Sequence, residues 1–353
     1  DAIKNEGRVI KIVERDKTGF VGTLKSKGDH YVVFTDDFKI PEIIIPKNNV
    51  NNGKIDEKVY VEIESYTPHL VGVVKKNLGS ADSNDAYMHG IALEQGFDFT
   101  FPENVEAEAD ALEKAGISED ERINRRDLRD TMTFTIDPAD AKDFDDAISF
   151  KTLDENTYEI GIHIADVSHY VTPGSALDEE AQKRTTSVYL VDRTIPMLPE
   201  GISNGLCSLR ENEEKLAFSA IFEIDKQTGR VNNEWYGRTI INSNKRFTYE
   251  EAQDIIDAKE GLFAHELLEL NRLSRIYEEK RYNNGALNFE TREVKFILDE
   301  VGKPISVKVK ERIDTNKLIE EFMLLANNGV SKFMADAPFF IYRVHDRPEL
   351  ERV

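Results

Sequence analysis

The sequence predicts an α+β protein, with an all-β barrel at its N-terminus followed by a mixed α/β domain. Three observations lead to this prediction: a length of 353 residues, short apolar runs separated by turn residues before residue 79, and strands interleaved with amphipathic helices after residue 131. A chain of this length suggests two or three domains. We therefore divide it into residues 1–79, a partly helical connecting segment at 80–130, and a second domain at 131–353.

The N-terminal prediction depends on a series of short strands with Gly, Asp, Asn and Pro between them. The expected strands are Gly7–Glu14, Gly19–Leu24, Tyr31–Phe34, Ile43–Ile45, Val59–Ile63 and Val71–Val74. Several short strands at close spacing predict a small barrel of the OB type. Aromatic residues such as Phe34 lie among lysines here, a mixture that can stack bases and neutralise phosphates. The alternative is that the aromatic side chains form the core and the lysines only keep the domain soluble.

Composition limits the kinds of partner that the chain can have. A hydrophobic content of 40% with 32% charged residues is typical of a soluble protein with a sizeable core. The net charge of −21 argues against a generally basic surface for nucleic acid, but residues 1–79 hold 13 Lys+Arg against 12 Asp+Glu. Cys207 is the single cysteine, and neither a signal peptide nor a membrane-length apolar run is present. We therefore expect a cytoplasmic protein that does not bind membranes.

The most informative stretch is acidic and lies between two predicted strands. Residues 135–150 read TIDPADAKDFDDAISF, and the carboxylates in it are Asp137, Asp140, Asp143, Asp145 and Asp146. Neighbouring carboxylates raise each other's pKa, so a compensating charge is expected. Hard oxygen ligands suit Mg²⁺, with Mn²⁺ as an alternative. Strands at 132–136 and 147–150 would hold this loop in place, but an acidic surface loop with no ligand remains the other interpretation.

Two other sites with clustered aspartates fit less well. An EF-hand calcium loop that starts at Asp137 needs Gly at its sixth position and Glu at its twelfth, where the chain has Lys142 and Ile148. A phosphatase with an aspartate nucleophile needs an apolar strand directly before Asp143 or Asp145, and the residues before Asp143 are Asp-Ala-Lys.

The stretch TIDPADAKDFDDAISF resembles the signature of the RNase II/RNase R family of 3′-to-5′ exoribonucleases, and is most similar to that of RNase R. The later segments GIHIADVSHYVTPGSALDEEA and SVYLVDRTIPMLPEGISNGLCSLRENEEKLAFS resemble the catalytic domain of that family in the same order. The resemblance implies a cold-shock-type RNA-binding domain at 1–79 and the N-terminal portion of an RNase II-type catalytic domain at 131–353. Because that domain normally continues past Val353, the resemblance also suggests a chain truncated within it.

The resemblance further implies roles for individual residues. One or two Mg²⁺ ions would be held by Asp137, Asp143, Asp145 and Asp146, of which we expect Asp145 to affect the rate most. Bases near the RNA 3′ end would stack on Tyr189 and Phe289. Residues near the substrate would also include Arg210, with a salt bridge to a neighbouring glutamate as its alternative, and Glu320 or Glu321 on a predicted helix at 316–327.

The prediction is therefore a Mg²⁺-dependent hydrolytic exoribonuclease that degrades single-stranded RNA from its 3′ end to nucleoside 5′-monophosphates. A chain truncated there is expected to bind metal weakly and to degrade RNA slowly or, as an inactive fragment, not at all. The alternative is a noncatalytic RNA-binding protein on the same scaffold, although four retained carboxylates argue against it. A phosphatase is a weaker third hypothesis. No obligate protein partner is inferred.

Three further features are given structural interpretations from the sequence. His163 on a predicted strand is expected to be structural. Thr248 and Glu251 form the two ends of a predicted helix capping box. A short basic cluster is expected to balance nearby acids rather than to bind RNA, and comprises Arg122, Arg125, Arg126 and Arg129.

Overall fold

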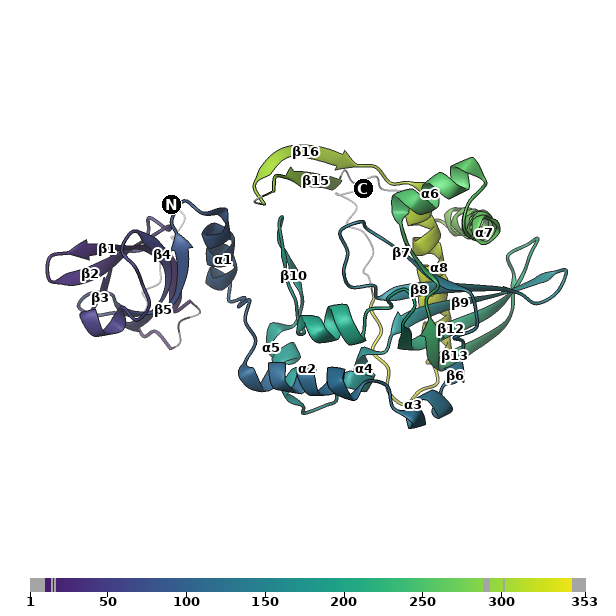
Figure 1. The fold of residues 1–353 in the computed structure, drawn as a ribbon, viewed down its shortest axis with the longest axis horizontal. Coiled ribbons are helices and arrows are strands. Elements are labelled where there is room, and N and C mark those ends of the chain that lie inside the picture. The colour runs from purple at the N-terminus through teal and green to yellow at the C-terminus, as the bar shows by residue number, and fades with distance from the viewer. Residues whose placement is uncertain (1–9, 14, 16, 288–292, 301, 345–353) are drawn as a thin grey trace, which may run out of the picture. The chain divides into compact units, whose positions relative to one another are not determined.

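The computed structural model describes residues 10–13, 15, 17–287, 293–300 and 302–344 (Figure 1). These residues form two compact units, which are treated separately below. The N-terminal unit comprises residues up to Pro102 together with Arg184–Met197 and Phe296–Val307, and the larger unit contains the rest. No helix in the described part of the chain is long and apolar enough to span a bilayer.

The N-terminal unit contains a closed five-stranded barrel in the order β1-β2-β3-β5-β4. Its strands are β1 (Gly19–Lys27), β2 (His30–Thr35), β3 (Ile43–Ile45), β4 (Glu57–Ser65) and β5 (Val71–Ser80), with a 3₁₀ turn η1 at Lys47–Asn49. Alternate apolar side chains fill the interior, and Leu24, Val33, Ile43, Ile45, Val59, Val61 and Val74 are fully buried. The barrel predicted from the short strands is confirmed.

The prediction of a first strand at Gly7–Glu14 is wrong for residues 10–13, the part of it that the structure describes. Residues 10–13 pair with no strand, and Ile10 and Val13 are 97% and 89% exposed. The remainder of the expected Gly7–Glu14 strand lies outside the described residues. The physical reason is that β1 to β5 already close the barrel, so it offers no free edge to another strand.

Helix α1 (Asn84–Glu94) follows β5 and packs against the barrel. The backbone N–H of Val21 on β1 donates to Oε1 of Glu94 at 2.9 Å. Lys58 on β4 is buried, with its ammonium 4.1 Å from the centre of the Tyr87 ring and paired with Asp36. The same unit holds a small hairpin of β10 (Val188–Tyr189) and β11 (Thr194–Ile195).

The larger unit is built on a seven-stranded sheet in the order β14-β7-β8-β9-β12-β13-β6. Its strands are β6 (Arg126–Asp127), β7 (Thr133–Asp137), β8 (Asp146–Thr152), β9 (Thr157–Ala165), β12 (Glu214–Asp225), β13 (Val231–Asn242) and β14 (Lys245–Thr248). Its main core combines sheet residues such as Phe134, Ile160 and Phe222 with side chains from three helices. Those helices are α6 (Tyr249–Ala258), α7 (Ala264–Asn283) and α8 (Asp314–Phe333).

Shorter elements complete the described chain. They are α2 (Glu103–Ala115), α3 (Glu119–Asn124), α4 (Val167–Tyr170), α5 (Ala176–Arg184), the π-helical turn η2 (Gly201–Leu206), and a two-stranded ribbon of β15 (Glu293–Leu298) and β16 (Pro304–Lys310). Helix α6 begins with the expected capping box, in which Thr248 Oγ1 accepts from the N–H of Glu251 at 3.0 Å and Glu251 accepts from the N–H of Thr248 at 2.8 Å.

His163 lies at the centre of a buried hydrogen-bond chain that crosses the sheet. Its Nε2 is 2.8 Å from Oγ of Ser149 on β8, and its Nδ1 is 2.6 Å from Oγ of Ser219 on β12. Ser219 is in turn 2.6 Å from Oγ1 of Thr239 on β13. Burial lowers the pKa of His163 to about 3, so the ring is neutral at physiological pH. The structural interpretation of this histidine is confirmed.

The basic cluster before the sheet is neutralised by acids, as expected. Arg125 pairs with Asp166 at 2.7 Å, and both side chains are almost completely buried, with 1% and 0% exposed. Arg126 pairs with Glu159 at 3.0 Å and is 35% exposed. Arg122 and Arg129 both pair with Glu214.

We predict that Arg125→Met destabilises the larger unit by about 3 kcal/mol, because it leaves the buried Asp166 without its main partner. Thermal unfolding of that unit should then shift down by roughly 6–12 °C. Arg126→Met is the matched control, since it removes a neighbouring, more exposed pair worth about 0–1 kcal/mol. Equal losses of stability in the two variants would contradict the prediction.

Candidate active site

The acidic stretch forms a loop between the ends of two adjacent antiparallel strands. Strands β7 and β8 pair in the register Thr133↔Ser149 and Phe134↔Ile148. Asp137 is the last residue of β7 and Asp146 is the first residue of β8, so these two acids mark the ends of the loop at 138–145. The strands predicted on either side of the acidic stretch are confirmed.

Hydrogen bonds to its backbone hold this loop in place, and many of them come from residues just after η2. Ser208 Oγ accepts from the N–H of Phe144 at 3.0 Å and donates to the carbonyl oxygen of Lys142 at 3.1 Å. The N–H of Leu209 donates to the carbonyl of Phe144 at 2.8 Å, and the N–H of Ala165 donates to the carbonyl of Asp145 at 3.0 Å. The segment that contains Ser208 and Leu209 therefore fixes the path of the acidic loop.

Asp137 and Asp146 are the two acids of this stretch whose pKa is raised most. Asp137 is only 7% exposed, and its Oδ2 is buried without a hydrogen-bond partner among the described residues. Burial, together with the charges of Asp146 and Asp145, raises the pKa of Asp137 to about 6. Burial and the charge of Asp145 raise the pKa of Asp146 to about 6 as well. Each carboxylate is therefore held near another without full compensation.

The remaining three acids of the stretch differ in their surroundings. Asp145 reaches solvent, yet partial desolvation and the nearby charge of Asp143 still raise its pKa. Burial and the same Asp145 charge raise the pKa of Cys207 to about 12, so this thiol is protonated. Asp140 is exposed and pairs with Lys295 at 2.9 Å, which agrees with its omission from the expected metal ligands.

The donor set fits a hard divalent cation, since it consists of carboxylate oxygens and includes a buried oxygen that lacks a partner. As the side chains stand, no three His, Cys, Asp or Glu residues in the described ranges are grouped closely enough to hold an ion. The carboxylates are coupled through their charges instead, Asp137 to Asp145 and Asp146, and Asp145 to Asp143. The four-aspartate metal site therefore stays a prediction.

Two residues near the acids were missed by the sequence analysis. Arg246 donates from Nη2 to the carbonyl of Pro138 at 2.6 Å, and its guanidinium lies 5.3 Å from the centre of the Phe144 ring. Burial and the charges of Asp146 and Asp137 raise the pKa of Tyr249 to about 12. Both residues are brought there because β14 pairs in parallel with β7, a register that no local pattern reveals.

The other expected site residues are distributed between the two units. Tyr189 lies on β10 in the N-terminal unit, with 69% of its surface exposed. Arg210, in the larger unit, is exposed and forms no ion pair with any residue that the structure describes. Phe289 lies outside the described residues. The roles expected for these three residues stay predictions.

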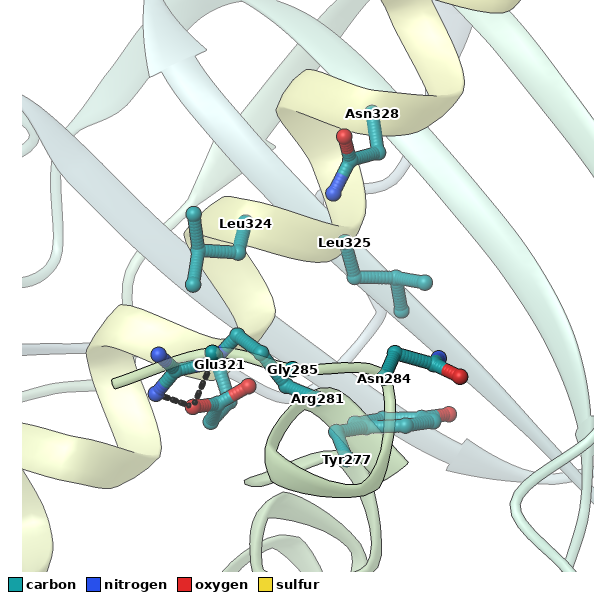
Figure 2. A pocket seen from close by; sticks show the side chains of 9 residues that line it. Tyr277, Arg281, Asn284, Gly285, Glu321, Leu324, Leu325 and Asn328 are labelled. Carbon is teal, nitrogen blue, oxygen red and sulfur yellow. Dashed lines mark hydrogen bonds and ion pairs between the residues drawn. The ribbon is translucent and has the colours of Figure 1, made fainter. Parts of the chain in front are cut away.

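The two candidate glutamates on α8 have different environments. Glu321 is 4% exposed and accepts from Arg281 on α7 at 2.5 and 3.0 Å. Figure 2 shows this ion pair at the side of a cavity of about 450 Å³. The cavity is lined by Tyr277, Arg281, Asn284, Gly285, Ala286, Glu321, Leu324, Leu325 and Asn328. Glu320 pairs with Arg281 at 3.5 Å and with Arg312, and its side chain is 36% exposed.

Comparisons with known proteins agree with this architecture. The RNB domain model matches residues 125–353, and the cold shock domain model matches residues 31–102. The chain thus combines a cold-shock barrel of the OB type with an RNB catalytic domain, and it belongs to the RNase II/RNase R family.

Individual relatives match nearly the whole of this chain, but the match covers only part of their own length. Ribonuclease R of Thermotoga maritima is 39% identical over 360 residues, which are 98% of this chain and 50% of that protein. The chain spans about half the length of the curated relatives that it matches first.

Solved structures give the same result for the fold. Mycoplasma genitalium RNase R in complex with ribose methylated single-stranded RNA matches with a TM-score of 0.87 and 27% identity, over 97% of this chain and 55% of that one. Yeast Ssd1, a pseudonuclease, matches with a TM-score of 0.64 and 20% identity, over 93% of this chain and 42% of that one, and shows the fold alone.

We expect the acidic loop to make stability depend on pH. A raised carboxyl pKa means that the folded state binds its proton more tightly than the unfolded state, so stability falls as pH rises through the window from about 4 to about 6. Asp146→Asn removes the buried charge, so it should raise the melting temperature at pH 8 by about 2–4 °C. That gain should shrink steadily as the pH is lowered from 6 towards 4.

Thermal unfolding without added divalent metal would measure this. Asp140→Asn is the control, because Asp140 is exposed and already paired with Lys295. If the gain in melting temperature of Asp146→Asn does not vary with pH, the ionised carboxylate of Asp146 is not what destabilises the folded protein.

We predict that Ser208→Ala loosens the acidic loop, because it removes both hydrogen bonds between the Ser208 hydroxyl and the loop backbone. The loss should cost about 1–3 kcal/mol. Hydrogen exchange of peptides covering 139–146 should become faster. Ser243→Ala is a control, since it removes another buried hydroxyl, whose Oγ bonds the carbonyl of Lys245 at 3.3 Å. Unchanged exchange in the loop of Ser208→Ala would show that this serine does not hold it.

Proposed function

We propose that this chain is the metal-dependent hydrolytic part of a 3′-to-5′ exoribonuclease, acting on single-stranded RNA with release of nucleoside 5′-monophosphates. The observation that carries the proposal is the acidic loop between β7 and β8 inside a matched RNB domain. There Asp137 and Asp146 are mostly buried, and neighbouring carboxylates raise the pKa of both, while the charge of Arg246 compensates Asp137 only in part. A purely structural loop has no need for such a concentration of negative charge.

The proposed ligands of the metal are Asp137, Asp143, Asp145 and Asp146, and the proposed ion is Mg²⁺, with Mn²⁺ as the alternative. A divalent cation would supply polarisation of the scissile phosphate and stabilisation of the leaving oxygen. Asp145 is the acid proposed to affect the rate most, because it reaches solvent and its charge acts on both Asp137 and Asp146. Tyr249, beside Asp137 and Asp146, stays protonated at neutral pH and can donate a hydrogen bond into the same site.

Residues outside the acidic loop are proposed to bind the RNA. Tyr189 and Phe289 would stack on bases near the 3′ end, which is tolerant of sequence because every base has a π-face. Arg210 is proposed to contact a phosphate, and its exposed guanidinium with no ion pair among the described residues supports this role. Glu320 is preferred to Glu321 near the terminal nucleotide, because Glu321 is buried against Arg281.

The barrel is proposed to bind RNA upstream of the 3′ end. Phe34 and Phe38 are 50% and 102% exposed on it, so these aromatic rings can stack on bases. The Mycoplasma genitalium RNase R was solved both with ribose methylated single-stranded RNA and with double-stranded RNA. Those complexes support RNA as the substrate class here. A cytoplasmic location belongs to the same proposal.

The test is an RNA degradation assay with this 353-residue chain. In the presence of Mg²⁺, a 5′-labelled single-stranded RNA should shorten stepwise from its 3′ end. Asp145→Asn should slow the reaction on the order of 100-fold or more, because it removes a charged ligand of the proposed metal. Asp140→Asn, the matched control within the same loop, should retain activity close to that of the unsubstituted chain.

The other outcomes separate the alternatives. RNA binding without any cleavage, with or without Mn²⁺, would refute the exonuclease proposal for this chain and leave two alternatives, an inactive fragment of an exonuclease and a noncatalytic RNA-binding protein. The same assay with a C-terminally extended chain would separate them, because only the extended exonuclease should cleave. Cleavage of a phosphomonoester but not of RNA would favour the phosphatase.

A further inference from the structure

The hairpin that carries Tyr189 is too small to define its own position. Strands β10 and β11 share only two residue pairs, Val188↔Ile195 and Tyr189↔Thr194. The N–H of Leu190 donates to the carbonyl of Arg193 at 2.8 Å and closes the turn. An isolated two-stranded hairpin is at best marginally stable in water, and this one is much shorter than most. Contacts outside the hairpin must therefore fix the direction of the Tyr189 side chain.

Arg184, at the end of α5 and at the base of the hairpin, makes the most extensive of these contacts. Its Nη1 donates to the carbonyl of Asp98 at 2.7 Å, and its Nη2 donates to the carbonyl of Thr100 at 2.7 Å. Nη1 is also 3.4 Å from the carbonyl of Pro196, the residue that follows β11. The guanidinium lies 3.8 Å from the centre of the Phe101 ring, within cation–π range.

Arg184 therefore links both sides of the hairpin base to the segment at 98–101, which follows α1. The guanidinium uses its two terminal nitrogens on three backbone carbonyls and one face on an aromatic ring. A group engaged in this way is poorly placed to bind an RNA phosphate as well.

A second arginine connects the tip of the same hairpin to the barrel. Arg193 pairs with Asp85 on α1, and with its own neighbour Asp192 at 2.7 Å. Helix α1 packs on the barrel, where Glu94 accepts from the N–H of Val21. Arg184 and Arg193 thus anchor the hairpin at both ends, and all of these groups belong to the N-terminal unit.

We propose that Arg184 is a positioning residue for Tyr189, through which the barrel unit sets where the RNA 3′-terminal bases are stacked. The inference rests on the proposed stacking role of Tyr189, and it adds that the N-terminal unit holds that residue in place. Arg184 acts on the RNA through the hairpin and not through its own charge. The two parts can be tested separately.

The experiment compares variants of the whole chain for hairpin order and for base stacking. Hydrogen exchange of peptides covering 188–195, without RNA, reports the order of the hairpin. The fluorescence of a 2-aminopurine placed near the 3′ end of a single-stranded RNA reports stacking, because stacking on an aromatic ring quenches it. EDTA prevents cleavage during the measurement, and anisotropy gives the overall affinity.

Arg184→Lys keeps the charge but loses the paired donors and the flat face. We expect faster hairpin exchange, loss of most of the quenching that Tyr189→Ala removes, and about fivefold weaker binding of the 3′ end. The salt dependence of binding should not change, because no phosphate contact is lost. Phe101→Leu removes the ring under the guanidinium without changing any charge, so it should produce the same changes in smaller measure.

Lys183→Ala is the matched control, since it removes an adjacent cation whose side chain is 75% exposed, and it should leave hairpin exchange and quenching as they are. Unchanged exchange and quenching in both Arg184→Lys and Phe101→Leu would overturn the proposal, as would faster exchange with quenching intact. If RNA binding by Arg184→Ala depends less steeply on salt concentration while the hairpin stays protected from hydrogen exchange, Arg184 instead contacts a phosphate directly. Full quenching in Tyr189→Ala would refute the stacking role of Tyr189. Faster hairpin exchange in Arg184→Lys would then show only that Arg184 anchors the hairpin.

Discussion

Like charges held together where water cannot screen them are the constraint on which the larger unit depends. Asp137 and Asp146 lie at the adjoining ends of two buried strands, and the pKa of each is raised to about 6. The surrounding structure resists their repulsion through the backbone, with Ser208 bonded to both Phe144 and Lys142, and Arg246 bonded to Pro138. We therefore expect repulsion between the ionised carboxylates to destabilise this loop, and a bound cation to offset that repulsion. On the proposed metal assignment, affinity for a divalent ion and stability of the loop would be two consequences of one arrangement.

The loop is an exception within a strongly acidic chain. Other buried acids pair with cations, as in Arg125–Asp166, Arg281–Glu321 and Lys183–Glu180. Such pairs fix the geometry of the sheet edge and of helices α7 and α8, because removing one partner would leave an uncompensated buried charge. Arg246 lowers the pKa of Asp137 by its charge without cancelling the rise, and it donates its hydrogen bond to the carbonyl of Pro138. Acids in the scaffold are neutralised by ion pairs, whereas acids in the loop have raised pKa values. This difference is the physical basis for choosing the loop as the candidate site.

The N-terminal unit contains more than the five-stranded barrel. Its compact body includes the hairpin that carries Tyr189, although that hairpin is more than 100 residues away from the barrel strands in the sequence. Arg184 and Arg193 make this connection through hydrogen bonds, ion pairs and an aromatic contact. If bases stack on Tyr189, the barrel unit and the stacking residue respond to the RNA as one body.

Local pattern determined much of this protein, because alternation, turn residues and capping boxes act over a few neighbouring residues. The five barrel strands, the strands around the acidic loop and the Thr248 cap are predicted in this way and are confirmed. The expected strand at Gly7–Glu14 has the right alternation, but its described part is unpaired because the barrel is already closed. Arg246, Tyr249, Ser208 and Arg184 have no distinguishing local signal. Their roles arise from the parallel register of β14 with β7, from the segment after η2 lying against the acidic loop, and from the contacts of Arg184 with residues 98–101. Only the tertiary structure decides these, since each depends on pairing between segments far apart in the chain.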